Sequence, residues 1–445
     1  MRFRSIIRLL AQALVAAGGD AQTSTAIPPV RPLGPIIATS TDMLGVVAQI
    51  RVLSDARVLA NDTHDKRVVL FDSSLARFTR VIDTTSETAR AYGARGGALF
   101  SFTGDTSLFG DVVSLSMLVI DPAGKIARVV AAPRGLGGGL VYMLIPGFGA
   151  TIDGHGHMVS QWSSGFGGGP APTTAAPATP QEMRDSASII RMDLITKKAD
   201  TAAWLNLPSN WVLQSVGPQG GTRFQFLDNP LPAEDDWTVM PDGTIAVVRE
   251  LDYHIDWYAL DGSRTSTPKI AHQWVRVTDS MKTAIVDSTR MADSIAAARQ
   301  RVLDSIQTAA AAHTGVLAGG GGGAGGGGSG KAVAIGDAAF AASAYTPLYV
   351  DPSVLPDYLP PFLAAPDSLG ARAVKADADG NVWIRVNQPK RGEGGTIYDV
   401  VNREGALVDR IQLPGGTTLV GFGPGVAYLI SREGAGYVLA RARIH

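Results

Sequence analysis

Short stretches of alternating apolar and polar residues, separated by turn residues, recur along most of this chain. The clearest stretch begins at Trp237, passes through the turn Asp242-Gly243 into the apolar run 245–248, and continues as a second apolar run at 255–260. A repeat of two residues is typical of a half-buried β-strand, and an Asp-Gly pair is typical of a tight turn. The pattern therefore predicts antiparallel strands joined by short turns, and residues 373–411 repeat the same order.

Weaker copies of this unit have their first turns near Asp55, Asp105, Asp153 and Gly423. Three of the intervals between successive turns are about 40–50 residues, which is the usual repeat of a four-stranded propeller blade. The two longer intervals contain insertions. We therefore expect an all-β fold, a six-bladed β-propeller over residues 43–445 with a helical and glycine-rich insertion. The last unit lacks an outer strand, and we expect residues 43–52 to supply it and close the ring.

The two insertions differ in composition. Residues 163–186 are rich in Gly, Pro, Ala and Thr and predict a low-complexity loop, while residues 275–345 combine a helix with a glycine-rich linker. Thr278 is a good helix N-cap and Gly315 a good stop, and apolar residues between them recur at steps of three and four. The helix either lies on the rim of the propeller or binds a partner through a coiled-coil seam.

The N-terminus predicts export. Arg2 and Arg4 precede an apolar stretch that ends in small residues, so residues 1–21 are expected to be a signal peptide and residues 22–42 a linker. An amphipathic first helix of a cytosolic protein is the alternative. No later stretch has the roughly 20 apolar residues that span a bilayer. We expect a periplasmic or secreted protein that does not span the membrane after signal cleavage.

Composition excludes several kinds of site. The 39 basic and 40 acidic residues give a formal charge of −1, which argues against a nucleic-acid partner because such proteins need a basic surface. The chain has no cysteine, so it has no disulfide, thiolate metal site or cysteine nucleophile.

Four segments are similar to those of the bacterial six-bladed β-propeller proteins that are related to NHL-repeat propellers. These segments are the units at Asp242-Gly243 and Asp379-Gly380, the run 355–362 and the closing run 422–428. The resemblance covers most of residues 45–445 and implies the propeller fold. It implies no single function, because propellers of this kind include binding scaffolds, lyases and lactonases.

One candidate metal site is the pair His155 and His157. Alternation along a strand would place both imidazoles on one face, where they could chelate a metal ion. The alternative is a structural or surface role, because the pair directly follows the turn Asp153-Gly154.

Polar residues gather where the second strand of several units ends. Equivalent positions on different blades converge around a propeller channel, so we expect these segments to form a ligand-facing rim. A solvated loop face is the alternative. The candidate ligand-binding residues are Asp62, His64, Arg249, Glu250, Asp252, His254, Arg385 and Asn387.

The sequence contains no dominant catalytic motif. We expect an exported, non-catalytic binding or scaffolding propeller without a cofactor, whose partner is a small molecule, a glycan or a protein. The alternative is a metal-dependent hydrolase or lactonase of the gluconolactonase-like propeller type, with Glu250, Asp62 and Asn387 as the nearest candidates for the channel mouth. A third possibility is an interaction protein that docks through the helix at 279–313.

Overall fold

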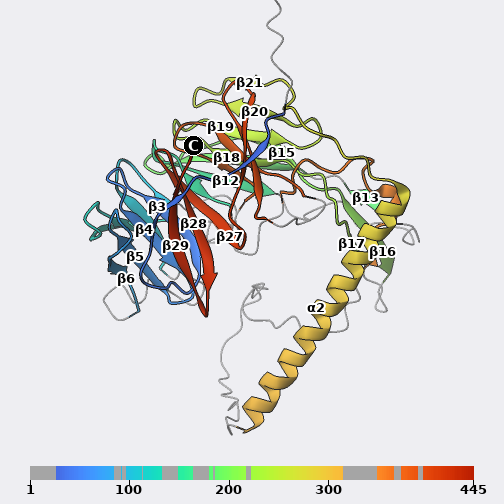
Figure 1. Cartoon of the computed structure of the whole chain (residues 1–445), viewed down its shortest axis with the longest axis horizontal. Coiled ribbons are helices and arrows are strands. Elements are labelled where there is room, and N and C mark those ends of the chain that lie inside the picture. Colours follow the sequence, from blue (N-terminus) through green and yellow to red (C-terminus); the bar gives the residue numbers. More distant parts are fainter. Residues whose placement is uncertain are drawn as a thin grey trace, which may run out of the picture.

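A computed structural model of the chain shows a protein built mostly of β-strands, with one long helix in the described part (Figure 1). The structure describes residues 27–84, 92, 97–112, 114–132, 149–163, 180–183, 186–216, 222–313, 348–364, 372–388 and 394–445. The all-β class predicted from the alternation is therefore confirmed.

Within those residues, six sheets are formed by strands that pair in a regular up-and-down order. Sheet 1 contains β3 (Val47–Val52), β4 (Val58–Asp62), β5 (Arg67–Phe71) and β6 (Phe78–Ile82). Sheet 2 contains β7 (Leu99–Ser101), β8 (Ser107–Asp111), β9 (Ser116–Ile120) and β10 (Ile126–Ala131). Sheet 3 contains β11 (Thr151–Ile152), β12 (His157–Ser163), β14 (Ser186–Asp193) and β15 (Ala199–Asn206). Sheet 4 contains β18 (Asp236–Val239), β19 (Ile245–Arg249), β20 (His254–Tyr258) and β21 (Arg264–Ser266). Sheet 5 contains β23 (Val374–Ala376), β24 (Val382–Arg385), β25 (Ile397–Val401) and β26 (Leu407–Gln412). Sheet 6 contains β27 (Thr417–Gly423), β28 (Val426–Glu433) and β29 (Gly436–Arg443).

The apolar core is divided among the gaps between these sheets. Strand β19 shows how alternation produces this division: Ile245 and Val247 pack towards sheet 3, while Ala246 and Val248 pack towards sheet 5. Further buried clusters join sheets 1 and 2, 2 and 3, and 5 and 6, and another joins sheet 6 back to sheet 1. Each sheet thus has an apolar neighbour on both faces, which is the packing of a β-propeller.

The predicted Asp-Gly turns form as expected. Gly243 has a φ of 83°, a conformation that side chains disfavour, and Asp242 accepts a hydrogen bond from the Thr244 N–H at 3.0 Å. Gly380 has a φ of 88°, and Asp377 receives N–H groups from Asp379 and Asn381. These turns set the register of the inner two strands in sheets 4 and 5.

The N-terminal prediction needs two corrections. Residues 22–42, which we expected to be a linker, contain β1 (Val30–Pro32), which pairs parallel with β26, and β2 (Ile36–Thr39), which pairs with β29. Strand β2 therefore supplies the outer strand of sheet 6, whereas the segment 43–52 mainly forms β3 of sheet 1. The alternation signal is weak at β2 because this short strand is largely exposed.

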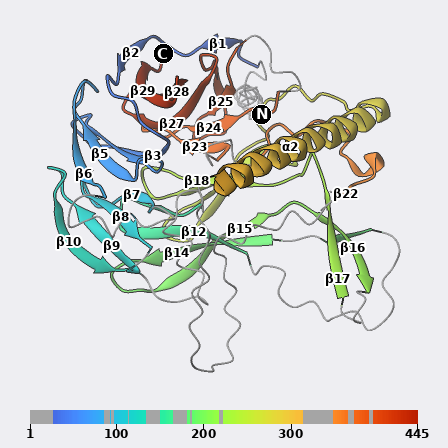
Figure 2. The same cartoon turned by 90° about the horizontal axis from the view of Figure 1, so that it is seen from below.

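A seventh sheet lies to one side of the others and was not predicted (Figure 2). It consists of β13 (Gln181–Met183), β16 (Asn210–Val216), β17 (Thr222–Asp228) and β22 (Leu348–Tyr349). Strand β13 falls within the insertion at 163–186 that we expected to be a loop, so that expectation is wrong for these residues. Residues 164–179 of that insertion, and the glycine tract after the helix, lie outside the described residues.

The predicted helix forms as α2 (Asp279–His313). The Thr278 hydroxyl accepts a hydrogen bond from the Met281 N–H, as an N-cap does. Val286 is buried beside Leu231 and Val350, and the Lys282 ammonium pairs with Asp357 at 2.8 Å. The first turns of α2 therefore pack near the seventh sheet, and Figure 1 shows the remainder extending past it. Neither α2 nor any other helix in the described ranges is both long and apolar enough to cross a bilayer.

Candidate functional site

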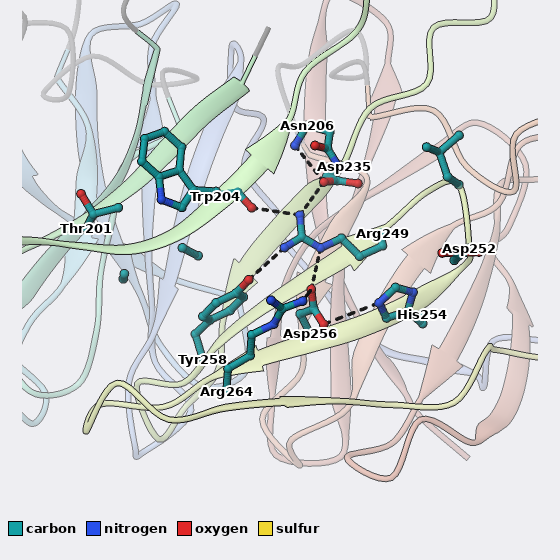
Figure 3. A pocket seen from close by; sticks show the side chains of 13 residues that line it. Thr201, Trp204, Asn206, Asp235, Arg249, Asp252, His254, Asp256, Tyr258 and Arg264 are labelled. Carbon is teal, nitrogen blue, oxygen red and sulfur yellow. Dashed lines mark hydrogen bonds and ion pairs between the residues drawn. The ribbon is translucent and has the colours of Figure 1, made fainter. Parts of the chain in front are cut away.

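The larger of two described pockets has a volume of about 480 Å³ and lies between sheets 3 and 4. One wall is the outer strand β15, and the other wall comes from β19, β20, β21 and the turn after β19 (Figure 3). The first strands of these two sheets, β11 and β18, contribute no lining residue, although Asp235 lies just before β18. The pocket is lined by Thr201, Ala202, Ala203, Trp204, Asn206, Asp235, Arg249, Leu251, Asp252, His254, Asp256, Tyr258 and Arg264.

Arg249 lies at the centre of the hydrogen-bond network in this pocket (Figure 3). Its Nε donates to Asp256 at 2.7 Å, its Nη1 donates to Asp235 at 2.6 Å and to the Trp204 carbonyl at 2.9 Å, and its Nη2 donates to Tyr258 at 2.9 Å. Burial opposes the charge of the guanidinium, but the two carboxylates outweigh burial and raise the pKa of Arg249. Arg249 therefore ties sheet 4 to the edge of sheet 3, with every guanidinium nitrogen already used.

Asp256 is the carboxylate on which this network depends. It is fully buried and accepts hydrogen bonds from Arg249, from Arg264 at 2.9 Å and from the Ser266 hydroxyl. Burial alone would raise the pKa of Asp256, but these donors lower it, so the group is a carboxylate at neutral pH. His254 Nε2 lies 3.5 Å from the same carboxylate.

The rim of the pocket is apolar and exposed. Trp204 on β15 is 59% exposed and Leu251, in the turn after β19, is 74% exposed. Beside Leu251, Asp252 pairs with Lys269 at 2.7 Å. Arg264 lies over the ring of Tyr258, with its guanidinium carbon 5.6 Å from the ring centre. The pocket thus combines exposed apolar surface with hydrogen-bond donors and acceptors whose charges largely balance.

Three of the candidate ligand-binding residues, Arg249, Asp252 and His254, come together in this pocket. Asn387 lines a second, smaller pocket, which is formed by two strands of sheet 5 and by connecting segments. Arg385 ends β24 and donates weakly to the Leu363 carbonyl at 3.5 Å. Arg249, Asp252 and His254 therefore line one pocket and Asn387 lines another, and no residue lines both.

Asp62 and His64 lie in sheet 1, away from both pockets. Asp62 is fully buried and accepts N–H groups from Gly45, Val46 and Asp65, together with Arg67 Nε at 3.0 Å. The His64 side chain is 72% exposed and contacts Asp65. The structure thus gives Asp62 a role in holding the chain together at the end of β4.

Glu250 is buried beside the main pocket and lines neither pocket. Its Oε2 has no hydrogen-bond partner among the described residues. Burial and the nearby Asp235 raise the pKa of Glu250 to about 8, and burial with Asp236 raises the pKa of Glu234 to about 7. Glu250 is therefore largely protonated at neutral pH, when it carries a hydroxyl instead of a charge.

The two histidines do not lie on one strand face. His155 is in the turn before β12, with Gly156 at a φ of 87° breaking the alternation, and its Nε2 lies 3.1 Å from the Asp242 carbonyl. His157 Nδ1 contacts the Asp153 carboxylate at 2.9 Å. Among the residues that the structure describes, no group of three or more His, Asp or Glu side chains could hold a metal ion. The prediction that both imidazoles share one strand face is therefore wrong, and the metal site stays a prediction.

Sequence reasoning missed several lining residues, above all Trp204, Asp235, Tyr258 and Arg264. Asp256 and Tyr258 were visible as polar positions within the strand at 255–260, where alternation points one face of β20 towards sheet 3. Trp204 and Asp235 flank an insertion that contains two strands of the seventh sheet, β16 and β17. Their positions in the sequence therefore do not indicate that Trp204 and Asp235 lie against Arg249 of sheet 4.

No family model and no curated protein matches the sequence. Among solved structures, regucalcin of Agrobacterium tumefaciens matches 94% of this chain and 98% of its own at 12% identity and a TM-score of 0.31. Virginiamycin B lyase of Staphylococcus aureus matches 92% of this chain and 99% of its own at 10% identity and 0.36. The β-propeller domain of Cps50 from Myceliophteria thermophila matches 93% and 100% at 10% identity and 0.35. At such low values these likenesses carry no argument about ligand or activity.

Proposed function

We propose that this protein is an exported, non-catalytic binding propeller whose six regular sheets are the blades of one closed ring, of the type related to NHL-repeat propellers. The ring is supported by the cluster in which Tyr428 and Leu439 of sheet 6 pack against Val58 and Phe71 of sheet 1. Export to the periplasm or the medium is supported by the basic and apolar N-terminus.

The ligand that best fits the pocket between sheets 3 and 4 is an uncharged molecule with several hydroxyl groups, such as a glycan. A guanidinium is the usual partner of an anionic ligand, but four of the five N–H groups of Arg249 already donate to the protein itself. Asp235 and Asp256 are likewise occupied. What the pocket offers is an exposed indole beside a balanced set of donors and acceptors, and a hydroxylated ring can use both.

The observation that carries this proposal is the mutual saturation of the charged groups. Catalysis by a carboxylate would need one that is free to exchange a proton with a ligand, and the buried carboxylates in this pocket are held by arginine. The lactonase-like alternative relied on Glu250, Asp62 and Asn387. Asn387 lines the other pocket and the other two residues line neither, so no observation favours that alternative.

Binding to a glycan panel tests the proposal, using the mature protein and isothermal titration for any positive glycan. Trp204→Ala should weaken binding about two- to tenfold, since a stacked aromatic ring contributes roughly 0.5–1.5 kcal/mol. Because Trp204 is largely exposed, the free energy of unfolding of the variant should differ from that of the parent protein by less than about 0.5 kcal/mol.

Trp274→Ala is the matched control. Trp274 is also a partly exposed indole, at 43%, but it lies outside this pocket, so its loss should leave glycan affinity unchanged. Equal losses in both variants, or no binding to any glycan, would remove this ligand class.

A further inference from the structure

The second pocket, of about 170 Å³, is lined by β25 and β26 of sheet 5 and by connecting segments outside the strands. It is formed where the connection after β21, the segment before β23 and the residues after β24 meet the start of β25 and the end of β26, which lie side by side in the antiparallel pair. Its apolar walls come from Ile27, Val275, Leu359, Pro360, Val386 and Ile397. Most of this lining is aliphatic, so the pocket suits a compact apolar group.

Asn387 brings an unsatisfied hydrogen-bond donor to this apolar pocket. Its backbone N–H is bound to the Pro361 carbonyl at 2.9 Å, which holds the residue in place. Its side-chain Nδ2 is buried and has no partner among the described residues. A buried donor left without an acceptor costs about 1–3 kcal/mol, so an acceptor in the pocket would recover that free energy.

Arg410 brings further donors to the same pocket. Its Nε donates to Asp399 at 3.0 Å, and Asp399 also accepts the Tyr253 hydroxyl at 2.8 Å. In the part of the chain that the structure describes, that bond is the single one made by the guanidinium, so its two terminal nitrogens remain available. Arg410 and Asp399 cancel each other's charge, and both of the donors that remain, Asn387 and Arg410, call for an oxygen acceptor.

His272 adds no charge to the pocket. Burial lowers the pKa of its imidazole, which packs edge-on against Tyr253 with ring centres 5.2 Å apart. The remaining polar lining groups are the amides of Gln273 and Gln388. A ligand here therefore meets neutral groups, the Arg410–Asp399 pair and an aliphatic wall.

We propose that this pocket binds a short-chain aliphatic carboxylate. One carboxylate oxygen accepts from Asn387 Nδ2 and the other from Arg410, while the aliphatic body lies against the apolar wall. A charge-assisted hydrogen bond to arginine is roughly twice as strong as a neutral one, so the carboxylate is favoured over an amide of the same shape. The site is separate from the proposed glycan pocket and does not depend on it.

Isothermal titration with butyrate, butyramide and butanol tests the proposal on the full mature protein. Butyrate should bind with a dissociation constant below about 10 mM, and the amide and the alcohol should bind at least about tenfold more weakly. Equal binding of butyrate and butyramide would overturn the carboxylate assignment. No binding of butyrate, or of its shorter and longer homologues, would overturn the site.

Two variants locate the binding. Asn387→Leu removes the unsatisfied donor at similar size, so it should weaken butyrate at least about tenfold while leaving the unfolding temperature unchanged or higher. Asn387→Asp places a like charge against the ligand and should abolish butyrate binding. Trp204→Ala, in the other pocket, should bind butyrate as the parent does. Unchanged butyrate affinity in both Asn387 variants would place the ligand elsewhere.

Discussion

The ends of β4 and β19 occupy corresponding places in sheets 1 and 4, yet one is closed and the other borders a pocket. Each has a buried carboxylate paired with an arginine, Asp62 with Arg67 and Asp256 with Arg249. At β4 the carboxylate is mainly held by backbone N–H groups of its own loop and of residues 45 and 46. At β19 the arginine instead reaches across to the carbonyl of Trp204 in sheet 3.

The segment that packs over each strand end, which we call the covering segment, explains this difference; in sheet 1 it is the chain around Gly45. Gly45 lies so close to the end of sheet 1 that a Cβ there would be 2.7 Å from the His64 Cβ. In sheet 4 the chain arrives from the seventh sheet, and Leu251 remains 74% exposed. The comparison teaches that similar polar residues at a strand end become either a structural clamp or a pocket wall, depending on which segment covers them.

The largest expected effect separates the two arginines. Arg249→Met should lower the free energy of unfolding by about 3–5 kcal/mol, because two buried carboxylates, Asp235 and Asp256, both lose the cation that they share and keep only two other hydrogen bonds each among the described residues. Arg67→Met should cost roughly 1–2 kcal/mol, because Asp62 keeps three N–H donors. Urea denaturation of both variants measures the difference. A greater loss in Arg67→Met would reverse the roles assigned to the two strand ends.

The next effect concerns pH. The pKa of Glu250 is about 8 in the folded protein and about 4.5 when exposed, so the folded state binds this proton more tightly. The free energy of unfolding should therefore fall as pH rises between these values, by on the order of 4 kcal/mol from this group. Glu250→Gln cannot ionise, so its stability advantage over the parent should grow from pH 5 to pH 8. Parallel stability curves for the two proteins would show that Glu250 is not buried as described.

The smallest effect tests the covering segment itself. Gly45→Ala should cost about 1–3 kcal/mol because the added methyl group forces the segment away from sheet 1. Leu251→Ala, at the matching place in sheet 4, should change stability by less than about 0.5 kcal/mol because that side chain is exposed. Thermal unfolding of the two variants is the measurement. Similar shifts in both would mean that the two strand ends are covered to the same extent.

Much of the fold could be predicted from local patterns. The units around Asp242-Gly243 and Asp379-Gly380 and the helix between Thr278 and Gly315 depend on contacts close in sequence, and all three formed. The seventh sheet was missed because β13, β16, β17 and β22 are brought together across long intervening segments. The candidate site was found in part: Arg249, Asp252 and His254 lie on one turn, whereas Trp204 and Asp235 come from other elements.

By itself, the sequence determined the strands and turns of the regular units and the all-β class, because alternation and Asp-Gly chemistry act over a few residues. Tertiary structure decided which strand closes sheet 6: β2 pairs with β29, at the opposite end of the chain. Tertiary structure also decided whether the polar residues at a strand end are sealed inside the protein or border a pocket. A carboxylate and an arginine predict an ion pair wherever they meet, but whether that pair is sealed, as at Asp62, or borders a pocket, as at Asp256, depends on the segment that packs over it.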